Sequence, residues 1–246
     1  MDRMLAATAA AEDTHYWFRA LRRVAARLLD ETLAGRSVEL VVDCGAGTGR
    51  NLDWLSRYGR AIGIELTPLA LRAGRSKGRP LVRGTVTALP LRAASVDVAT
   101  SFDVLYCLDD QSESAALAEM FRVLKPGGVA LVNAAALDLL RGSHSTLTHE
   151  VRRYTPSRLR DRLAAAGFQT ERITFTNMCL FAPAVAVRGL ERLTGRAAEA
   201  SEADLRVPPR AVNTVLDVCL RAEAAMLRVM NLPIGTSVMA VARKPG

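Results

Sequence analysis

Between about residues 38 and 175, short runs of β-branched and other apolar residues alternate with stretches of helical pattern. The short runs predict buried strands, and the stretches between them predict helices that pack against those strands. The strands expected from this pattern lie at 38–43, 61–65, 80–84, 96–101, 128–134 and 169–175, and the helices lie near 48–57, 67–75, 111–123 and 156–166. The alternation is typical of βαβ units, so we expect an α/β fold with a doubly wound, mostly parallel sheet.

Capping residues mark the ends of two of these helices. Thr155 and Pro156 suit the N-cap and first-turn positions of the last helix, and Gly167 suits the position just after its end. Asp109 and Asp110 precede the helix at 111–123, where their side chains would accept hydrogen bonds from free N–H groups of the first turn. We therefore interpret the two aspartates as capping residues instead of metal ligands, and we predict no metal site.

A glycine-rich segment after the first strand carries the most specific chemical signal. Asp43 ends the strand, and Gly45, Gly47 and Gly49 follow at every second position. Glycines at this spacing let the backbone approach a bound nucleotide closely. A helix that begins near Thr48 would direct its free N–H groups at the same crevice.

The residues around this segment narrow the choice of ligand. Arg50 stands where a dinucleotide-binding fingerprint has its third glycine, which disfavours a nicotinamide or flavin enzyme. Glu65 ends the second strand, twenty residues after Gly45, where a carboxylate can accept hydrogen bonds from both hydroxyls of a ribose. The pattern therefore predicts a site for a nucleoside cofactor.

Four motifs, in order, resemble those of the class I S-adenosylmethionine-dependent methyltransferases. In that family the first strand ends in DxGxGxG and the second ends in Asp or Glu. Further on, Gly84–Pro90 is similar to the family's adenine-side loop, Ser95–Asp103 to its fourth strand, and Leu124–Gly128 to the turn before its fifth, and the resemblance covers roughly residues 38–175. It implies a Rossmann-like, seven-stranded sheet, S-adenosylmethionine as the cofactor and S-adenosylhomocysteine as the product.

The segments outside this region extend the simple family plan. Residues 4–33 predict one or two helices with an aromatic cluster at 16–18, and about sixty residues separate the sixth strand from an antiparallel seventh strand at 236–242. We expect a helical insertion there with a long helix at 211–230, which either completes the core or serves as a lid or dimer surface. The predicted organisation is a single methyltransferase domain, 1–246, made of an N-terminal helical cap (1–35), a cofactor-binding core (36–175), the helical insertion (176–234) and the final strand (235–246).

The resemblance implies a cofactor site along the strand ends. Asp43 and the glycine loop would hold the amino-acid end of S-adenosylmethionine, and Glu65 would take the ribose hydroxyls. The alternative roles are ordering of the loop for Asp43 and a surface ion pair for Glu65. Thr85 and Val86 stand where many relatives carry an aspartate for the adenine, which departs from the family pattern. The predicted cofactor-binding residues are Asp43, Gly45, Ala46, Gly47, Gly49, Asn51 and Glu65, with Leu66, Thr85 and Val86 beside the adenine, Phe102 and Asp103 beside the methionine, and Arg19 from the N-terminal helices.

The acceptor is expected at the loop after the fifth strand, which family topology places over the transferred methyl group. His144 and His149 in this loop are candidate general bases, the alternative being that they are solvated or capping residues. Tyr106, after the fourth strand, is a further catalytic candidate. The predicted substrate-binding residues are Tyr16 and Trp17, whose helix either closes over the cofactor or packs on the sheet, and Arg152, Arg153 and Tyr154, which either hold an acidic group of the acceptor or form a basic turn.

Composition limits the classes of binding partner and the cellular compartment that we expect for this protein. The chain has 246 residues, of which 50% are hydrophobic, and a formal net charge of +8 carried almost entirely by arginine. Its basic residues are spread out, without the aromatic-interleaved stripe of a nucleic-acid binder, and no apolar stretch approaches the ~20 residues that cross a bilayer. We expect reduced cysteines, a cytoplasmic protein that is a monomer or homodimer, and no nucleic-acid or membrane partner.

These observations predict methyl transfer from S-adenosylmethionine to O, N or C of a small-molecule acceptor, such as a secondary metabolite or an activated sugar. Transfer from a sulfonium is an in-line displacement, so alignment and desolvation can supply most of the catalysis. The alternatives are an RNA methyltransferase and a non-catalytic S-adenosylmethionine-binding partner protein.

Overall fold

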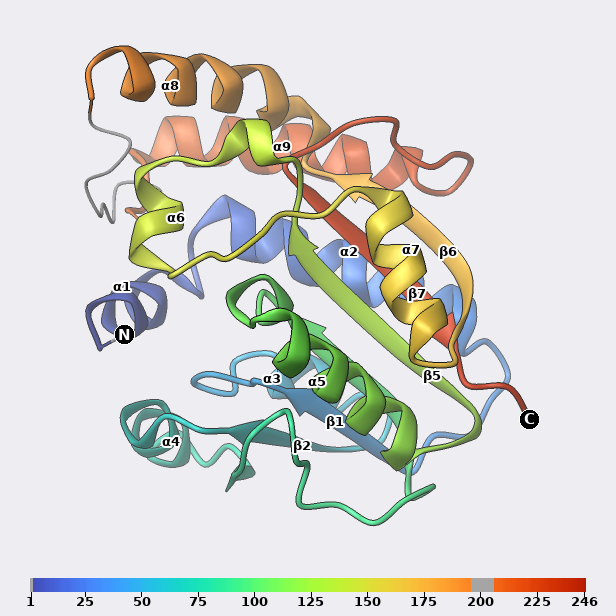
Figure 1. The fold of residues 1–246 in the computed structure, drawn as a ribbon. Helices are drawn as coiled ribbons and strands as arrows, with labels where there is room; N and C mark the ends of the chain where they lie inside the picture. Colours follow the sequence, from blue (N-terminus) through green and yellow to red (C-terminus); the bar gives the residue numbers. More distant parts are fainter. Residues whose placement is uncertain (1, 196–205) are drawn as a thin grey trace.

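A seven-stranded sheet forms the centre of the computed structural model, which describes residues 2–195 and 206–246 (Figure 1). Its strand order is β3-β2-β1-β4-β5-β7-β6, and β7 runs antiparallel to both of its neighbours while the pairs from β3 to β5 are parallel. The strands are β1 (Leu40–Cys44), β2 (Arg60–Glu65), β3 (Leu81–Arg83), β4 (Val96–Phe102), β5 (Leu124–Ala135), β6 (Gln169–Thr176) and β7 (Ser237–Arg243). The predicted α/β class, strand number and mostly parallel sheet are confirmed.

Helices cover both faces of this sheet. In Figure 1, α5 and α7 lie in front of the sheet, and α2 crosses behind it with α9 alongside. The helices are α1 (Asp2–Ala11), α2 (Tyr16–Thr32), α3 (Leu52–Leu55), α4 (Pro68–Arg75), α5 (Asp110–Val123), α6 (Ser143–Leu147), α7 (Pro156–Ala165), α8 (Phe181–Leu193) and α9 (Arg210–Met226), with 3₁₀ turns η1 (Leu105–Cys107), η2 (Asp138–Leu140) and η3 (Met178–Leu180). Because both faces are covered, the consecutive residues Val41 and Val42 of β1 are both fully buried.

The caps predicted at Asp109, Thr155 and Gly167 are confirmed, whereas Asp110 is the first residue of α5 and its carboxylate pairs with Arg152 at 3.0 Å. Asp109 caps α5 by accepting a 2.7 Å hydrogen bond from the Ser112 N–H, and Thr155 caps α7 by accepting one of 3.2 Å from the Arg158 N–H. Gly167 follows α7 with a φ of +97°, a conformation that glycine adopts without steric cost. The chain therefore begins α5 and ends α7 where the sequence indicated.

The helix predicted at 48–57 is wrong in extent. The structure has only the short helix α3 there, and it begins four residues later than predicted, at Leu52. Gly47 and Gly49 have φ values of +55° and +74°, so the chain forms a turn in which the Gly49 N–H bonds to the carbonyl of Ala46. A right-handed helix cannot include these backbone conformations, so the helix begins only after the glycine loop.

Helices precede the first strand and also lie between the last two strands, β6 and β7. Residues 2–32 form the two helices α1 and α2, separated at His15, whose Nδ1 caps α2 by accepting a 3.1 Å hydrogen bond from the Trp17 N–H. The segment predicted as an insertion holds α8 and α9 on either side of residues 196–205, which lie outside the described part of the chain. In the described ranges, no helix has the length and apolarity required to cross a bilayer.

Strand order also sets where a ligand can bind. The sheet grows in one direction from β1 through β2 and β3, and in the other from β4 onward. The chain leaves β1 toward β2 and leaves β4 toward β5, on opposite sides of the β1–β4 pair. This divergence opens a crevice at the carboxyl ends of these two strands. Asp43, at the end of β1, and Phe102, at the end of β4, lie at this edge.

Candidate functional site

The glycine loop lies at the carboxyl end of β1 and opens onto the crevice. A Cβ added to Gly47 would meet no atom within 4 Å, so the space beside this residue is free for a ligand. A Cβ added to Gly45 would instead collide with the side chain of Val104, which follows β4. The two glycines thus have different roles. Gly45 lets the glycine loop pack closely against the segment after β4, and Gly47 leaves space for a ligand.

Glu65 fixes this loop from the neighbouring strand. Its Oε2 accepts a 2.8 Å hydrogen bond from the Gly47 N–H, and its Oε1 accepts one of 2.7 Å from the Thr67 N–H. The side chain is buried and makes no ion pair with a described residue, so the alternative of a surface ion pair is wrong. Next to it, Leu66 is 59% exposed, which leaves an apolar side chain available to a planar base.

Asp43 is a buried carboxylate with a free oxygen. Thr100 donates a 2.7 Å hydrogen bond to its Oδ1, whereas Oδ2 accepts no hydrogen bond of standard geometry from a described residue. Burial raises the pKa of Asp43 to about 7, while Thr100 and the nearby Asn51 act in the opposite direction and the charge of Glu65 adds to the increase. An unsatisfied buried carboxylate oxygen is a costly feature that a cationic ligand would relieve.

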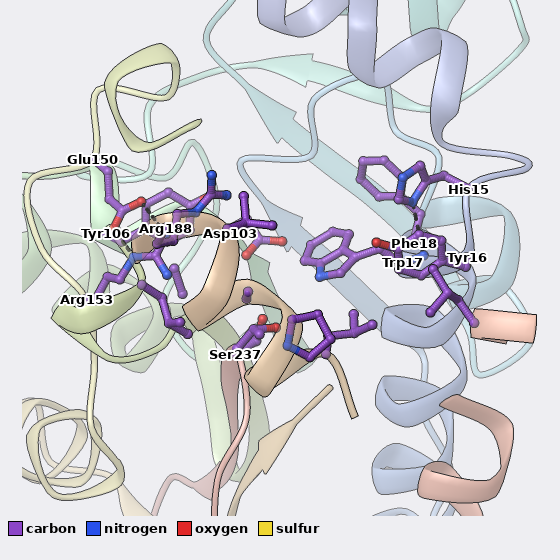
Figure 2. Close-up of a pocket in the computed structure, with 18 residues that line it drawn as sticks. His15, Tyr16, Trp17, Phe18, Asp103, Tyr106, Glu150, Arg153, Arg188 and Ser237 are labelled. Atoms are coloured by element: carbon purple, nitrogen blue, oxygen red, sulfur yellow. Dashed lines mark hydrogen bonds and ion pairs between the residues drawn. The ribbon is translucent and has the colours of Figure 1, made fainter. Parts of the chain in front are cut away.

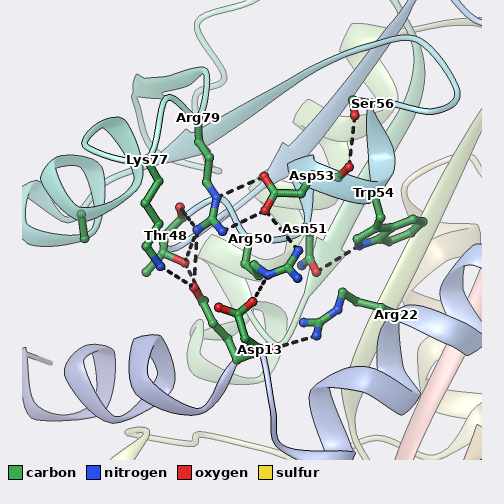
Figure 3. Close-up of polar contacts among 12 residues, drawn as sticks. Asp13, Arg22, Thr48, Arg50, Asn51, Asp53, Trp54, Ser56, Lys77 and Arg79 are labelled. Carbon is green, nitrogen blue, oxygen red and sulfur yellow. Dashed lines mark hydrogen bonds and ion pairs between the residues drawn. The ribbon is translucent and has the colours of Figure 1, made fainter.

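A polar network ties the joint between α1 and α2 to the glycine loop (Figure 3). The buried carboxylate of Glu12 accepts a 2.6 Å hydrogen bond from the Thr48 hydroxyl. Arg79 donates a 3.0 Å hydrogen bond to the Thr48 carbonyl and forms a 2.9 Å ion pair with Asp53. Beside this network, Asp13 pairs with Arg50 at the protein surface. The N-terminal segment therefore takes part in ordering the loop, a role that no local sequence signal indicated.

A cavity of about 340 Å³ lies beside the crevice (Figure 2). Its walls combine an aromatic group at the start of α2, an apolar face of α8 and a polar group near the loop after β5. The lining residues are His15, Tyr16, Trp17, Phe18, Asp103, Tyr106, Ala135, Leu140, Glu150, Arg153, Leu180, Pro183, Ala184, Val187, Arg188, Leu216, Thr236 and Ser237. This mixture of apolar walls and a few convergent polar groups is typical of small-molecule sites.

Asp103 joins the crevice to the cavity. It follows β4 in the left-handed region, with a φ of +60°, and precedes Val104, which contacts Gly45. Asn133 of β5 holds Asp103 twice, because its carbonyl accepts from the Asp103 N–H at 3.1 Å and its side-chain amide donates to Oδ1 at 2.9 Å. Burial raises the pKa of Asp103 to about 7, and the charge of Glu150 adds to the increase.

The structure brings several of the predicted acceptor-side residues together. Tyr16, Trp17, Tyr106 and Arg153 all line the cavity. Burial raises the pKa of Tyr106 well above its usual range, so its phenol stays neutral. These residues come from α2, η1 and the loop after β5, which are distant in the sequence and meet only in the folded chain.

Arg152 and Tyr154 face away from the cavity, which corrects their predicted role in acceptor binding. Tyr154 is fully buried and donates a 2.6 Å hydrogen bond to Glu113 of α5, and Arg152 pairs with the same carboxylate. The segment is extended, with Tyr154 bridging to Ala136, so alternate side chains point to opposite sides. Arg153 therefore reaches the cavity while its two neighbours reach α5.

Arg19 and His149 do not line the cavity. Arg19 forms a 3.1 Å ion pair with Asp217 of α9 and joins the helices α2 and α9. Its predicted contact with the cofactor stays a prediction. His149 is exposed, with a φ of +53°, and lies outside the cavity wall. The side chain of His144 falls outside the described part of the structure. A catalytic role for either histidine stays a prediction.

Four of the remaining predicted cofactor residues make contacts with other parts of the protein. Phe102 is buried with its ring edge-on to Trp54 at 6.3 Å, and Asn51 accepts a 3.3 Å hydrogen bond from the same indole. Thr85 shares a 2.9 Å hydrogen bond with Thr87, and Val86 packs against the core. Their contacts with a cofactor stay predictions.

Sequence reasoning missed part of the cavity wall. Phe18 belongs to the aromatic cluster at 16–18 that the sequence singled out, and His15 borders it, so their position was a usable signal. Glu150, Arg188 and Ser237 come from three separate elements and carried no such signal. These residues are brought together only by the fold, in which α8 and the start of β7 lie at the same end of the sheet as the loop after β5.

Comparisons with known proteins agree with this geometry. A methyltransferase-domain family matches residues 42–132. A predicted S-adenosylmethionine-dependent methyltransferase of Mycolicibacterium smegmatis is 34% identical over 165 residues, which covers 65% of this chain and 62% of that protein. Malonyl-[acyl-carrier protein] O-methyltransferase 1 of Coxiella burnetii is 36% identical over 119 residues, covering 47% of this chain and 40% of that protein. The chain thus spans 40% to 62% of the length of these curated relatives.

A solved structure extends the likeness in fold to the full chain. A methyltransferase in complex with the Haloferax volcanii Trm112 methyltransferase activator matches with a TM-score of 0.62 and 20% identity, covering 100% of this chain and 96% of that one. The strand order, the glycine loop and these matches together make the chain similar to the S-adenosylmethionine-dependent methyltransferases. The residues present fit that cofactor, since Gly47 leaves space, Asp43 has a free buried oxygen and Leu66 is exposed beside Glu65.

Proposed function

We propose that this protein transfers a methyl group from S-adenosylmethionine to a small-molecule acceptor bound in the 340 Å³ cavity. The observation that carries the proposal is the shared turn after β4, where Val104 contacts Gly45 of the cofactor loop and Asp103 lines the cavity. A nucleophile in the cavity is therefore close to the crevice that the cofactor would occupy. Such alignment of two bound reactants supplies much of the rate of a displacement reaction.

The cavity favours a compact acceptor of mixed polarity, such as a secondary metabolite. Trp17 and Phe18 with the apolar face of α8 suit an aromatic or aliphatic body, and Arg153 with Glu150 suits a polar end. At about 340 Å³ the cavity is at the small end of the range for ligand sites. An activated sugar carries a nucleotide and phosphates besides the sugar, so we favour the secondary metabolite over it.

The chain's own residues bind and align the reactants. When bound, the cofactor supplies a methyl group attached to a sulfonium, which leaves as a neutral thioether. Asp43, Gly47 and Glu65 would hold its amino-acid and ribose parts. The apolar side chains of α2 and α8 would exclude water from the acceptor, which strengthens the remaining polar contacts.

A labelled-methyl assay tests this function. Purified protein is incubated with tritiated S-adenosylmethionine and a panel of phenols, carboxylic acids, amines and hydroxyquinones, and S-adenosylhomocysteine release is measured in parallel. We expect calorimetric binding of S-adenosylhomocysteine and labelled product from at least one small acceptor. Transfer only to RNA would overturn the proposal in favour of an RNA methyltransferase. Cofactor binding without transfer to any acceptor would favour a non-catalytic binding protein.

A further inference from the structure

We infer that Asp103 is the general base that removes the proton from the acceptor, an assignment that rests on the proposed methyl transfer. The acceptor's hydroxyl or amine gives its proton to the free oxygen of the Asp103 carboxylate. The acceptor's lone pair forms the bond to the methyl carbon, and the bond from that carbon to sulfur breaks with its electron pair going to sulfur. Charge and atoms balance, because the proton leaves on the carboxylate.

The geometry around Asp103 supports this role. Asn133 donates to Oδ1 at 2.9 Å, and Oδ2 makes no hydrogen bond or ion pair with a described residue. Figure 2 shows Asp103 in the middle of the cavity, with Trp17 on one side and Tyr106 and Glu150 on the other. One oxygen therefore fixes the orientation of the carboxylate, and the other is available to a ligand that lies against either wall.

The backbone of Asp103 is held in an uncommon conformation. Its φ of +60° is rare for residues other than glycine, although aspartate adopts it more readily than most. The bond from its N–H to the Asn133 carbonyl, 3.1 Å long, maintains this conformation and turns the side chain into the cavity. Local strain of this kind is often found where a side chain must be aimed at a ligand.

The other candidate bases in the cavity are already engaged. Glu150 accepts two hydrogen bonds from the guanidinium of Arg153, one of them 3.1 Å long. His15 uses its Nδ1 to accept from the Trp17 N–H at 3.1 Å. Tyr106 stays neutral because burial raises the pKa of its phenol well above its usual range. Asp103 is the cavity-lining carboxylate that has no ion pair within the described ranges.

The electrostatic surroundings suit proton removal near neutral pH. The groups coupled electrostatically to Asp103 are Glu150, from the loop after β5, and Tyr106 and Cys107, from η1. Two cations line the same cavity: Arg153, which pairs with Glu150, and Arg188 of α8, which pairs with Glu191. Burial keeps the two η1 groups neutral, and it raises the pKa of Cys107 to about 12. Burial and Glu150 raise the pKa of Asp103 to about 7, close to the value at which a general base works best at physiological pH.

The test compares Asp103→Asn with wild type, and Asp161→Asn, an exposed aspartate on α7, is the matched control. Three measurements are made. The first is the calorimetric affinity for S-adenosylhomocysteine, and the second is the pH profile of transfer to the acceptor found in the labelled-methyl panel. The third is an NMR pH titration of aspartates labelled at the side-chain carboxyl carbon. We expect Asp103→Asn to bind S-adenosylhomocysteine within about threefold of wild type, to lose at least about 100-fold in kcat, and to lose the ionisation near pH 7. The NMR signal missing in Asp103→Asn should titrate near pH 7 in the wild type.

Each opposite result overturns the inference. A loss of tenfold or more in S-adenosylhomocysteine affinity with kcat unchanged would mean that Asp103 contacts the cofactor instead. An unchanged pH profile would assign the base elsewhere, and an NMR titration below about pH 5 would exclude Asp103 without any acceptor. The proposed function fails separately, when the wild type binds no cofactor or transfers no methyl group.

Discussion

The hydroxyl of Thr48, in the glycine loop, donates a 2.6 Å hydrogen bond to the buried carboxylate of Glu12, at the joint between α1 and α2 (Figure 3). Lys77 and Arg79 lie 3.6 Å and 3.4 Å from the other oxygen of the same carboxylate. The carboxylate of Glu12 therefore binds the Thr48 hydroxyl and lies close to the cations of Lys77 and Arg79, beside the loop that would hold the cofactor. The conformation of the loop therefore depends on residues 36 positions earlier in the chain.

We predict that Glu12→Gln weakens binding of S-adenosylhomocysteine by about 10- to 160-fold, because the amide cannot balance the two cations, a hydrogen bond to a charged group is worth about 1.5–3 kcal/mol, and about 1.4 kcal/mol is a tenfold change in affinity. Titration calorimetry measures the affinity. Asp13→Asn is the matched control, since its partner Arg50 is at the surface and exposed pairs contribute little. Equal affinity in wild type and Glu12→Gln would show that the network does not order the loop.

Gly47→Val should abolish cofactor binding while the protein stays folded. The side chain would enter the open space beside the loop, at a backbone φ of +55°. Gly78→Val is a matched control, because Gly78 has a φ of +75°, equally open surroundings and a position in the turn after α4. Both variants should lose similar stability on thermal melting, and only Gly47→Val should lose binding of S-adenosylhomocysteine. If both bind normally, the crevice beside Gly47 is not the cofactor site.

The sequence predicted those features of the fold and the site that depend on residues close together in the chain. Apolar runs placed the strands, because a strand buried on both faces needs apolar residues throughout. Spacing alone located Asp43, the glycines and Glu65, since these lie at strand ends. The helix expected from 48 was too long because only the structure reveals the positive φ values of Gly47 and Gly49. Contacts across long separations, such as Glu12 with Thr48, leave no pattern in the sequence.

Glu65→Ala should weaken S-adenosylhomocysteine binding by about 1–3 kcal/mol, the cost of leaving hydrogen-bonding groups unpaired. The variant loses the contacts to the N–H groups of Gly47 and Thr67 as well as any contact to a ribose. A 2′-deoxy analogue of the ligand separates the two effects. Wild type should discriminate against the analogue, and Glu65→Ala should bind both ligands equally. Unchanged affinity for S-adenosylhomocysteine in Glu65→Ala would rule out the ribose role.

The stability of the cofactor-free protein should fall between pH 5 and pH 7 because of Asp43. The unfolded chain ionises this carboxyl near 3.8, whereas the folded protein retains its proton up to about pH 7. Unfolding therefore releases a proton in this window, and the free energy of unfolding decreases as pH rises. Relative to wild type, Asp43→Asn should gain roughly 2–3 kcal/mol between pH 5 and pH 8 in urea unfolding, at about 1.4 kcal/mol per pKa unit. Asp161→Asn should follow wild type, and parallel curves for all three proteins would contradict the raised pKa.

Tyr154→Phe distinguishes acceptor binding from core stability in the loop after β5. The structure buries the Tyr154 hydroxyl 2.6 Å from Glu113, whose carboxylate also pairs with Arg152 and with Arg162 at 3.0 Å. Removing the hydroxyl leaves a buried carboxylate without one of its donors, so we expect a loss of about 1–3 kcal/mol in the free energy of unfolding, measured with urea. Transfer to the acceptor and binding of S-adenosylhomocysteine should be unchanged at temperatures where the variant is folded. The opposite result, normal stability with a raised KM for the acceptor, would mean that Tyr154 contacts the acceptor in solution.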